Sequence, residues 1–300
     1  MIARNLDEVR EIRARMPDAV ARAAAARIRR PLLNNAGRLM IIAADHPARG
    51  ALGVRDNALA MADRNDLVER VVTALSQSGV DGVLATADIL EDLLLLGALE
   101  DKVVIGSMNR GGLQGASFEL DDRFTGYDIE GIASAGLDGG KMLCRIDIDD
   151  PGTVATLESC SRAVTELARQ RLMAMVEPFI SRRFNGRVHN DLTAEAVLRS
   201  VTITSGLGAS SAYTWLKLPV VDGMEQVMAA TTLPTLLLGG DPSRLPEETY
   251  ATWEKALALP GVRGLVVGRA LLYPPDGDVE AAVKAAAALV RGPEKGQVVR

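Results

Sequence analysis

Leu39-Met40-Ile41-Ile42-Ala43-Ala44-Asp45 is an uninterrupted apolar segment that ends on a carboxylate. A segment that is apolar at every position is typical of a strand buried on both faces of a parallel sheet. Similar runs recur along the chain, at 82–86, 102–107, 141–146, 172–176, 212–219, 234–238 and 263–267. Segments with helical composition separate these runs, and this alternation predicts parallel strands with helices outside them.

Eight strand–helix units within 300 residues are typical of a (β/α)8 TIM barrel, an α/β fold. An open doubly wound sheet is the alternative. Its G-x-G-x-x-G fingerprint is absent after the first strand, where Asp45-His46-Pro47 stands instead. No linker or change in composition divides the chain, so we expect one domain over residues 1–300. Residues 1–37 form a helical extension in this interpretation, with a helical stretch at 5–30 that Pro31 ends.

The composition limits the class of protein. The chain is 48% hydrophobic, which is ample for a large core, and its net charge of -5 argues against a general nucleic-acid or anionic-membrane partner. No apolar run reaches the roughly 18 residues of a membrane span, and the charged N-terminal segment does not resemble a signal peptide. We therefore expect a cytoplasmic protein with no membrane partner. Its two cysteines predict neither a disulfide framework nor a zinc site.

Lys217 lies within the apolar run at 212–219. The chain has 34 basic residues, of which only six are lysines, so arginine is its usual surface cation. A buried ammonium loses hydration and its pKa falls, and arginine cannot replace an amine that must attack a carbonyl. We interpret Lys217 as a Schiff-base lysine. The alternative is a structural lysine that pairs with a carboxylate or reaches water.

In a TIM barrel, catalytic residues lie at the carboxyl ends of strands. Asp45 is a candidate acid/base there, or a cap for the turn at His46-Pro47. Glu177 is a second acid/base, an ion partner of a lysine, or a turn carboxylate. Lys141 is a cation beside Lys217 or a substrate-binding charge, or else a solvated residue at the strand mouth.

The last two strands are followed by Gly239-Gly240 and Gly268-Arg269. Loops at these positions often bind phosphate through backbone N–H groups, and Arg269 would add a charge-assisted contact. Arg145 is a candidate for binding a substrate carboxylate or phosphate, although it can equally be structural.

The chain contains two histidines. His46 is placed among the substrate-binding candidates because it follows the first strand, and His189 is interpreted as a surface-loop residue. No metal-ligand spacing such as H-x-x-x-H occurs. We therefore predict neither a metal nor a cofactor.

Four segments, taken in order, resemble the class I aldolases of the deoxyribose-phosphate, tagatose-bisphosphate and archaeal-type fructose-bisphosphate aldolase superfamily. They are Ile42-Ala43-Ala44-Asp45-His46-Pro47, Trp215-Leu216-Lys217-Leu218, Leu236-Leu237-Leu238-Gly239-Gly240 and Gly264-Leu265-Val266-Val267-Gly268-Arg269. The chain looks most similar to actinobacterial aldolase-like barrels associated with inositol catabolism. The resemblance implies a (β/α)8 barrel, an imine on Lys217, an active-site aspartate at Asp45 and phosphate binding near both glycine turns. Lys141 looks similar to the fourth-strand lysine of the tagatose-bisphosphate type.

Two features depart from parts of that superfamily. The run at 235–240 has no lysine, unlike the second active-site lysine of deoxyribose-phosphate aldolases. The aromatic acid/base of the fructose-bisphosphate type has only Tyr213 and Trp215 as candidates. The loop at 109–124 is longer than most strand–helix loops and is a candidate lid or substrate wall.

The expected function is a metal-independent class I aldolase or lyase that acts on a phosphorylated sugar or keto-acid-like compound. In one alternative the barrel is an isomerase or epimerase that uses Asp45 and Glu177 as acid and base. In another it binds a sugar phosphate without turnover. We also expect a homo-oligomer, for which the apolar helix at 89–99 is a candidate interface.

Overall fold

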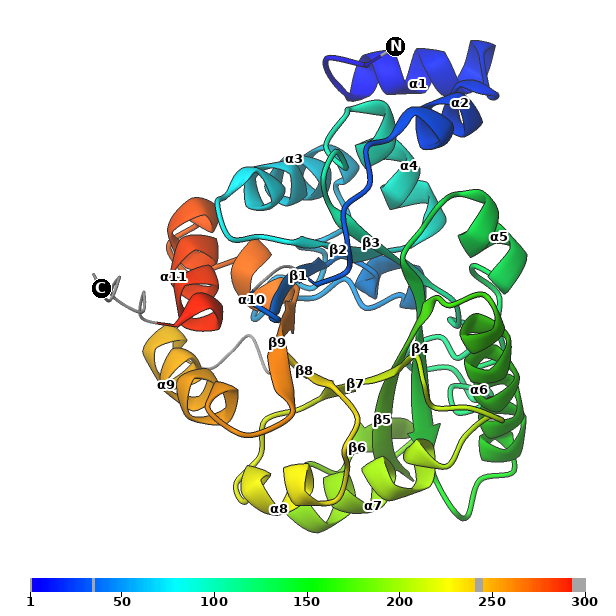
Figure 1. Ribbon diagram of the computed structural model, residues 1–300, viewed down its shortest axis with the longest axis vertical. Coiled ribbons are helices and arrows are strands. Elements are labelled where there is room, and N and C mark those ends of the chain that lie inside the picture. Colours follow the sequence, from blue (N-terminus) through cyan, green and yellow to red (C-terminus); the bar gives the residue numbers. More distant parts are fainter. Residues whose placement is uncertain (1, 34–35, 241–244, 293–300) are drawn as a thin grey trace, which may run out of the picture.

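Eight parallel strands form a closed barrel in the computed structural model, which describes residues 2–33, 36–240 and 245–292. The strands are β1 (Leu39–Ala43), β2 (Gly82–Ala85), β3 (Val103–Ser107), β4 (Gly139–Ile146), β5 (Met173–Phe184), β7 (Thr214–Leu218), β8 (Thr235–Leu238) and β9 (Val262–Val267). They pair in the order β4-β3-β2-β1-β9-β8-β7-β5, and the pairing of β4 with β5 closes the ring (Figure 1). The predicted (β/α)8 barrel is confirmed, and the open sheet is excluded.

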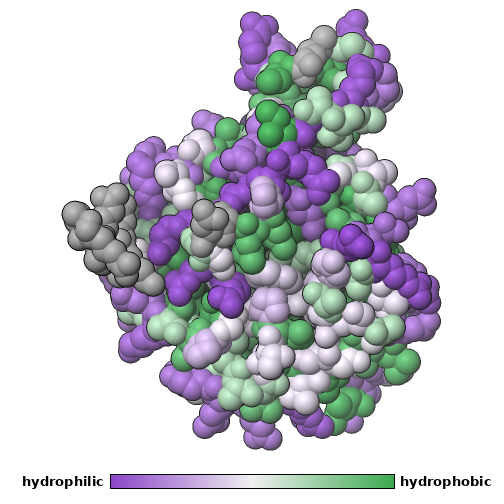
Figure 2. Space-filling view, viewed as in Figure 1, coloured by the Kyte–Doolittle hydropathy of each residue, from purple (hydrophilic) through white to green (hydrophobic). Residues whose placement is uncertain are grey.

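Helices surround the barrel (Figure 1). They are α3 (Arg64–Ser76), α4 (Ala87–Leu95), α5 (Ile129–Ser134), α6 (Gly152–Arg169), α7 (Ala194–Ser205), α8 (Met224–Ala229), α9 (Pro246–Leu257), α10 (Arg269–Leu272) and α11 (Val279–Arg291), with a short 3-10 helix η1 (His46–Arg49) after β1. Figure 2 shows hydrophilic side chains around the rim of the molecule, as expected for helices whose apolar sides pack on the strands. None of the described helices is long and apolar enough to cross a membrane.

The N-terminal segment forms two helices, not the single stretch expected at 5–30. Helix α1 (Leu6–Arg15) ends just before Pro17, and α2 (Ala19–Ala26) follows it. Proline lacks the N–H that a continuing helix needs, which accounts for the break. Apolar side chains of α1 pack with Leu95 of α4, so the extension lies against one side of the barrel (Figure 1). Its description as part of one domain over 1–300 stays a prediction, and the C-terminal residues 293–300 lie outside the described part.

One apolar cluster fills the inside of the barrel. It comprises Leu39, Ile41, Ala43, Leu84, Val103, Ile105, Met173, Met175, Trp215, Leu236 and Val266. The residues that alternate with these on the strands pack in a second cluster against the helices. Because strand side chains alternate, the inward faces continue to Asp45, Glu177 and Lys217 at the carboxyl ends of their strands. Periodicity alone left that orientation open.

Strand β5 extends beyond the expected strand at 172–176 and turns back on itself. It runs to Phe184, and β6 (Arg187–Asn190) pairs with it in antiparallel fashion. Asn185 and Gly186 make the two-residue turn with φ of 50° and 75°, which is the geometry that Asn-Gly favours in hairpins. The run expected at 172–176 is therefore only the first part of a longer strand, and a hairpin stands beside the mouth of the barrel.

Candidate active site

A cavity of about 780 Å³ opens at the carboxyl ends of the barrel strands. All ten residues predicted to form the site line it, and they are Asp45, His46, Lys141, Arg145, Glu177, Lys217, Gly239, Gly240, Gly268 and Arg269. Six of the eight parallel strands, or the turns that follow them, supply these residues. The fold thus brings together side chains that are up to 224 positions apart in the sequence (269 minus 45). Their roles stay predictions.

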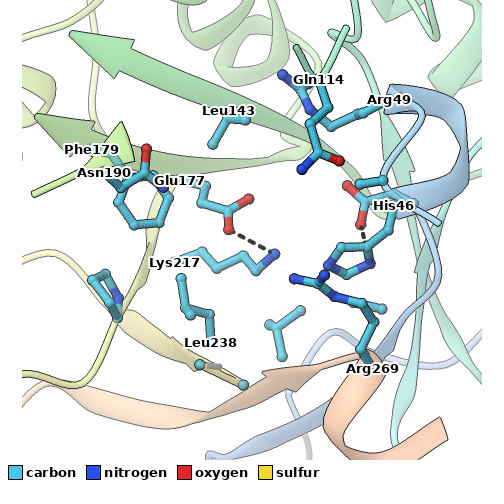
Figure 3. A pocket seen from close by; sticks show the side chains of 18 of the residues that line it. His46, Arg49, Gln114, Leu143, Glu177, Phe179, Asn190, Lys217, Leu238 and Arg269 are labelled. Atoms are coloured by element: carbon cyan, nitrogen blue, oxygen red, sulfur yellow. Dashed lines mark ion pairs between the residues drawn. The ribbon is translucent and has the colours of Figure 1, made fainter. Parts of the chain in front are cut away.

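Four buried charged side chains form a chain of alternating sign at the base of the cavity. Nζ of Lys141 lies 2.9 Å from Oδ2 of Asp45 and 2.6 Å from Oε2 of Glu177. The second oxygen of Glu177, Oε1, lies 3.1 Å from Nζ of Lys217 (Figure 3). Lys141 is the third residue of β4 and is as buried as Lys217, so it is not the solvated residue of the alternative interpretation.

The two lysines have opposite pKa shifts. Burial lowers the pKa of Lys217; Glu177 opposes this effect, and the nearby ammonium of Lys141 adds to it, so that the pKa lies below its usual value. Burial would lower the pKa of Lys141 as well, but the charges of Asp45 and Glu177 raise it above the usual value. Lys217 is therefore the lysine that more readily becomes a neutral amine, and Lys141 stays a cation.

The two carboxyl groups are held in their ionised form. Burial would raise the pKa of Glu177, but Lys141 and then Lys217 lower it to about 2. The pKa of Asp45 is also held far below its usual range, because the attraction of Lys141 and Lys217 exceeds the effect of burial. Both groups are anions at neutral pH, so each can stabilise a cation or accept a proton.

His46 lies beside Asp45, at the first position of η1. Burial lowers its pKa to about 4; Asp45 opposes this shift, and Arg269 adds to it. The imidazole is therefore neutral at pH 7. Its Nδ1 is buried and has no hydrogen-bond partner among the described residues, and Asp45 Oδ1 is 3.8 Å away. His46 thus faces the cavity as a neutral group that can donate or accept one hydrogen bond.

Steric crowding or backbone conformation favours glycine at three positions of the two glycine turns. A Cβ on Gly268 would lie 2.4 Å from the carbonyl oxygen of Ala43, and a Cβ on Gly239 would lie 2.7 Å from Val267. Gly240 has a φ of 71°, which favours glycine. Arg269 begins α10 and donates to the carbonyl oxygen of Gly53. These turns expose backbone to the cavity, as their predicted role in phosphate binding requires.

Arg145 lines the cavity, but protein groups already hold its guanidinium. Nη1 donates to Oε1 of Glu119 at 2.5 Å, and Nη2 donates to the carbonyl oxygens of Glu119 and Gly112. Nε is buried and has no hydrogen-bond partner in the described structure. The arginine therefore anchors the loop at 109–124, and its contact with substrate stays a prediction.

Several lining residues were not predicted from the sequence. Arg49 lies on η1, Gln114 and Glu119 lie on the loop at 109–124, and His189 and Asn190 lie on β6. The loop forms a wall of the cavity, which is one of its two predicted roles. His189 is exposed as predicted, but it lies on a strand of the hairpin at the cavity mouth. The signal that could have located the hairpin is Asn185-Gly186.

No group of three or more His, Cys, Asp or Glu side chains is arranged to hold a metal ion within 2–33, 36–240 and 245–292. The expectation that the protein uses neither a metal nor a cofactor stays a prediction.

Comparison with known proteins relates this chain to a family and to solved barrels. The sequence model of the Cgl0159-like family matches residues 37–287. No curated protein matches the chain. The crystal structure of Cgl0159 from Corynebacterium glutamicum (Brevibacterium flavum) is 56% identical with a TM-score of 0.94, and the match covers 97% of this chain and 98% of that one.

More distant solved structures share the barrel. An archaeal fructose 1,6-bisphosphate aldolase is 19% identical with a TM-score of 0.63, and the match covers 91% of this chain and 99% of that one. A second archaeal structure, with its catalytic Lys covalently bound to the carbinolamine intermediate of the substrate, has the same identity and TM-score and covers 91% and 100%. At this identity the likeness establishes the fold alone.

Proposed function

This chain belongs to the Cgl0159-like family, and from that premise we propose that it is a class I aldolase, a lyase that forms an imine between Lys217 and a carbonyl substrate. The observation that carries the proposal is the pair of lysines at the base of the cavity. The pKa of Lys217 is lowered by burial and that of Lys141 is raised by two carboxylates. Such a pair provides a neutral amine next to a fixed cation, as amine nucleophiles require.

The reaction begins when the neutral amine of Lys217 attacks the carbonyl carbon of the substrate. The carbonyl oxygen takes up a proton to give a carbinolamine, which loses water to give a protonated imine. A base then removes the proton from the hydroxyl group two carbons from the imine carbon. The bond between the carbon that carries this hydroxyl group and the carbon next to the imine carbon breaks, an aldehyde leaves, and the bonding electron pair passes into the imine, which becomes an enamine on Lys217. Protonation of the enamine carbon and hydrolysis release the second product and the amine.

Glu177 is placed to move these protons. Its Oε1 lies 3.1 Å from Nζ of Lys217, which is within reach of a group bonded to that nitrogen. Lys141 holds Oε2 of the same carboxylate and also holds Asp45. Asp45 is the second candidate for proton transfer in this proposal. Lys141 keeps the charge that favours the neutral form of Lys217.

The expected substrate is a phosphorylated sugar or a keto-acid-like compound. Gly239, Gly240, Gly268 and Arg269 provide backbone and a guanidinium on the cavity wall, next to the neutral His46. Archaeal fructose-bisphosphate aldolases of similar fold support a sugar phosphate, and one of them holds a carbinolamine on its catalytic lysine. A role in inositol catabolism, a cytoplasmic location and a homo-oligomeric state stay predictions.

The isomerase or epimerase alternative receives less support from the site. In such an enzyme a carboxylate must remove a proton from carbon, which needs a base whose pKa is not strongly lowered. Both Asp45 and Glu177 are ion-paired with Lys141, and both have lowered pKa values. They are better suited to stabilise cations and to shuttle protons between oxygen and nitrogen.

Borohydride trapping tests the proposal. The protein is incubated in turn with dihydroxyacetone phosphate, glyceraldehyde 3-phosphate, acetaldehyde, pyruvate and malonic semialdehyde, then reduced and analysed by intact and peptide mass spectrometry. We expect a reduced adduct on the peptide that contains Lys217, and the compound that reacts identifies the carbonyl half of the substrate.

Two lysine variants serve as matched controls. Lys217→Arg keeps a cation but removes the amine, so the adduct should disappear. Lys141→Arg keeps the cation between Asp45 and Glu177, so the adduct on Lys217 should remain. If no compound reacts with Lys217 while a sugar phosphate still stabilises the fold against heat, the aldolase proposal is wrong and a non-catalytic binding barrel or an isomerase takes its place.

A further inference from the structure

Two arginines that line the cavity, Arg49 and Arg145, are each ion-paired with a carboxylate of the loop at 109–124, so the wall that these residues form carries no net charge. We propose that the part of the substrate that lies against this wall is uncharged and hydroxylated, so that the preferred substrate carries one anionic group and not two. This inference rests on the proposed aldolase function and specifies its substrate class. It is carried by the two ion pairs of the wall and by the position of Gln114.

The first ion pair joins Arg49 and Asp122. Nη2 of Arg49 lies 2.5 Å from Oδ2 of Asp122, whose side chain is fully buried. Both Nη groups of Arg49 also donate to loop carbonyl oxygens, those of Asn109 and Gly112. Oδ1 of Asp122 in turn accepts from the backbone N–H of Gly112. Both terminal nitrogens of Arg49 are therefore already bonded to the loop, and its charge is paired with Asp122.

The second ion pair joins Arg145 and Glu119. Both side chains are buried, and Oε1 of Glu119 lies 2.5 Å from Nη1 of Arg145. Oε2 of Glu119 accepts from the backbone N–H of Gly115. Burial lowers the pKa of Arg145, and the charge of Arg49 lowers it further. A phosphate placed here would meet the carboxylate of Glu119 and would have to displace it.

The charges of this wall therefore cancel. Arg49 and Arg145 supply two positive charges, and Asp122 and Glu119 supply two negative charges. Asp122 also lies 3.7 Å from Arg145, which links the two pairs into one cluster. An anionic group that contacts this cluster would lose its hydration, and the neutral cluster would give it no net electrostatic attraction to compensate. A hydroxyl group or an aldehyde oxygen loses much less.

Gln114 provides the polar contact that such a neutral group needs. Its backbone N–H donates to the carbonyl oxygen of Arg49, which fixes the residue to the rim of the site. Figure 3 shows its side-chain amide pointing toward the cavity above Lys217, on the side opposite Leu238. An amide offers both a donor and an acceptor and carries no charge, so it suits a hydroxyl group.

The test compares two acceptors that differ only in a phosphate. With dihydroxyacetone phosphate as the donor, kcat/KM for aldol addition is measured with D-glyceraldehyde and with D-glyceraldehyde 3-phosphate. We expect kcat/KM to be about tenfold or more higher for the unphosphorylated acceptor, because the neutral wall does not attract a phosphate. Equal use of the two acceptors, or a preference for the phosphorylated one, would overturn the inference while the aldolase proposal stands.

Two variants separate charge from hydrogen bonding. Glu119→Gln removes the negative charge that neutralises Arg145, so the relative use of D-glyceraldehyde 3-phosphate should rise about tenfold. Gln114→Leu should lower kcat/KM for D-glyceraldehyde by about tenfold, the effect of one lost hydrogen bond, and leave propanal unaffected. An equal loss with both aldehydes would show that Gln114 acts on loop structure and not on recognition.

Borohydride trapping distinguishes failure of the aldolase function from failure of the inference about the substrate. Dihydroxyacetone phosphate should trap on Lys217 equally in the wild type, in Glu119→Gln and in Gln114→Leu, because neither variant changes the lysine pair. Failure of all five carbonyl compounds to trap on Lys217 of the wild type would overturn the aldolase function, and the inference with it. A normal adduct combined with a preference for the phosphorylated acceptor would overturn the inference alone.

Discussion

The carboxylate of Glu177 lies 3.1 Å from the amine of Lys217, and the other oxygen of the same carboxylate is held by Lys141 at 2.6 Å. Glu177 is thus the group through which the two lysines are connected. Its negative charge raises the pKa of both lysines and opposes the lowering effect of burial on Lys217. The fraction of Lys217 that is a neutral amine therefore depends on this carboxylate.

Replacing Glu177 with glutamine should lower the pKa of Lys217 further. The variant removes a charge that raises this pKa and leaves the burial that lowers it. Trapping of a small carbonyl compound on Lys217, measured as adduct formation against pH, should then shift to lower pH than in the wild type. Turnover should fall by about a hundredfold or more, because the proposed general acid/base catalysis by Glu177 is lost.

Asp45→Asn is the matched control for that experiment. It removes a carboxylate that contacts Lys141 and has a smaller effect on the pKa of Lys217 than Glu177 has. Its trapping profile should therefore shift less than that of Glu177→Gln. Equal shifts in the two variants would mean that Glu177 has no special influence on Lys217.

Between pH 6.5 and pH 4 the protein should lose stability through His46. The folded-state pKa of His46 is about 4, below its ordinary value of 6.5, so the unfolded chain binds a proton first as the pH falls. The loss grows from pH 6.5 downward, levels off below pH 4 and is at most about 3 kcal/mol. Glu177 acts in a lower window, since its pKa of about 2 keeps its stabilising effect intact above pH 4.5.

His46→Gln, which cannot titrate, checks this expectation. Thermal unfolding of the variant should change less between pH 6.5 and pH 4 than that of the wild type. Parallel curves for the two proteins over this range would show that groups other than His46 account for the loss.

Gly264 should tolerate no side chain. It lies on β9 against β1, with a φ of 134°, and a Cβ at this position would lie 1.8 Å from the carbonyl oxygen of Leu39. Gly264→Ala must therefore separate two central strands or distort the backbone, at a cost on the order of 3 kcal/mol or more. Chemical denaturation measures this cost as a change in the free energy of unfolding.

Gly277→Ala is the control for backbone conformation alone. Gly277 also has a positive φ, 78°, but no atom lies within 4 Å of the position that a Cβ would take there. Its substitution should cost only about 1 kcal/mol. Similar costs at the two positions would contradict the close contact between β9 and β1 at Gly264.

Much of the barrel could be predicted from the sequence, because its strands are buried on both faces over most of their length and are therefore largely apolar. Runs such as 39–45 and 263–267 stand out from the amphipathic helices between them. The hairpin of β5 and β6 was missed because it lacks this apolar pattern. Its residues at 181–190 are largely polar and exposed, and only Asn185-Gly186 indicated a turn between strands.

The sequence by itself determined which residues are the candidates for the chemistry of this site. Lys217, Lys141 and Glu177 were recognisable because charged side chains are rare inside apolar strands and costly to bury. Only the tertiary structure decided how these charges are paired. It placed Glu177 between the two lysines, and it joined Arg145 to Glu119 on a loop that precedes it by 26 residues. Periodicity cannot supply this information, because the two faces of a doubly buried strand look alike in sequence, and an ion pair depends on the distance between segments that only barrel closure brings together.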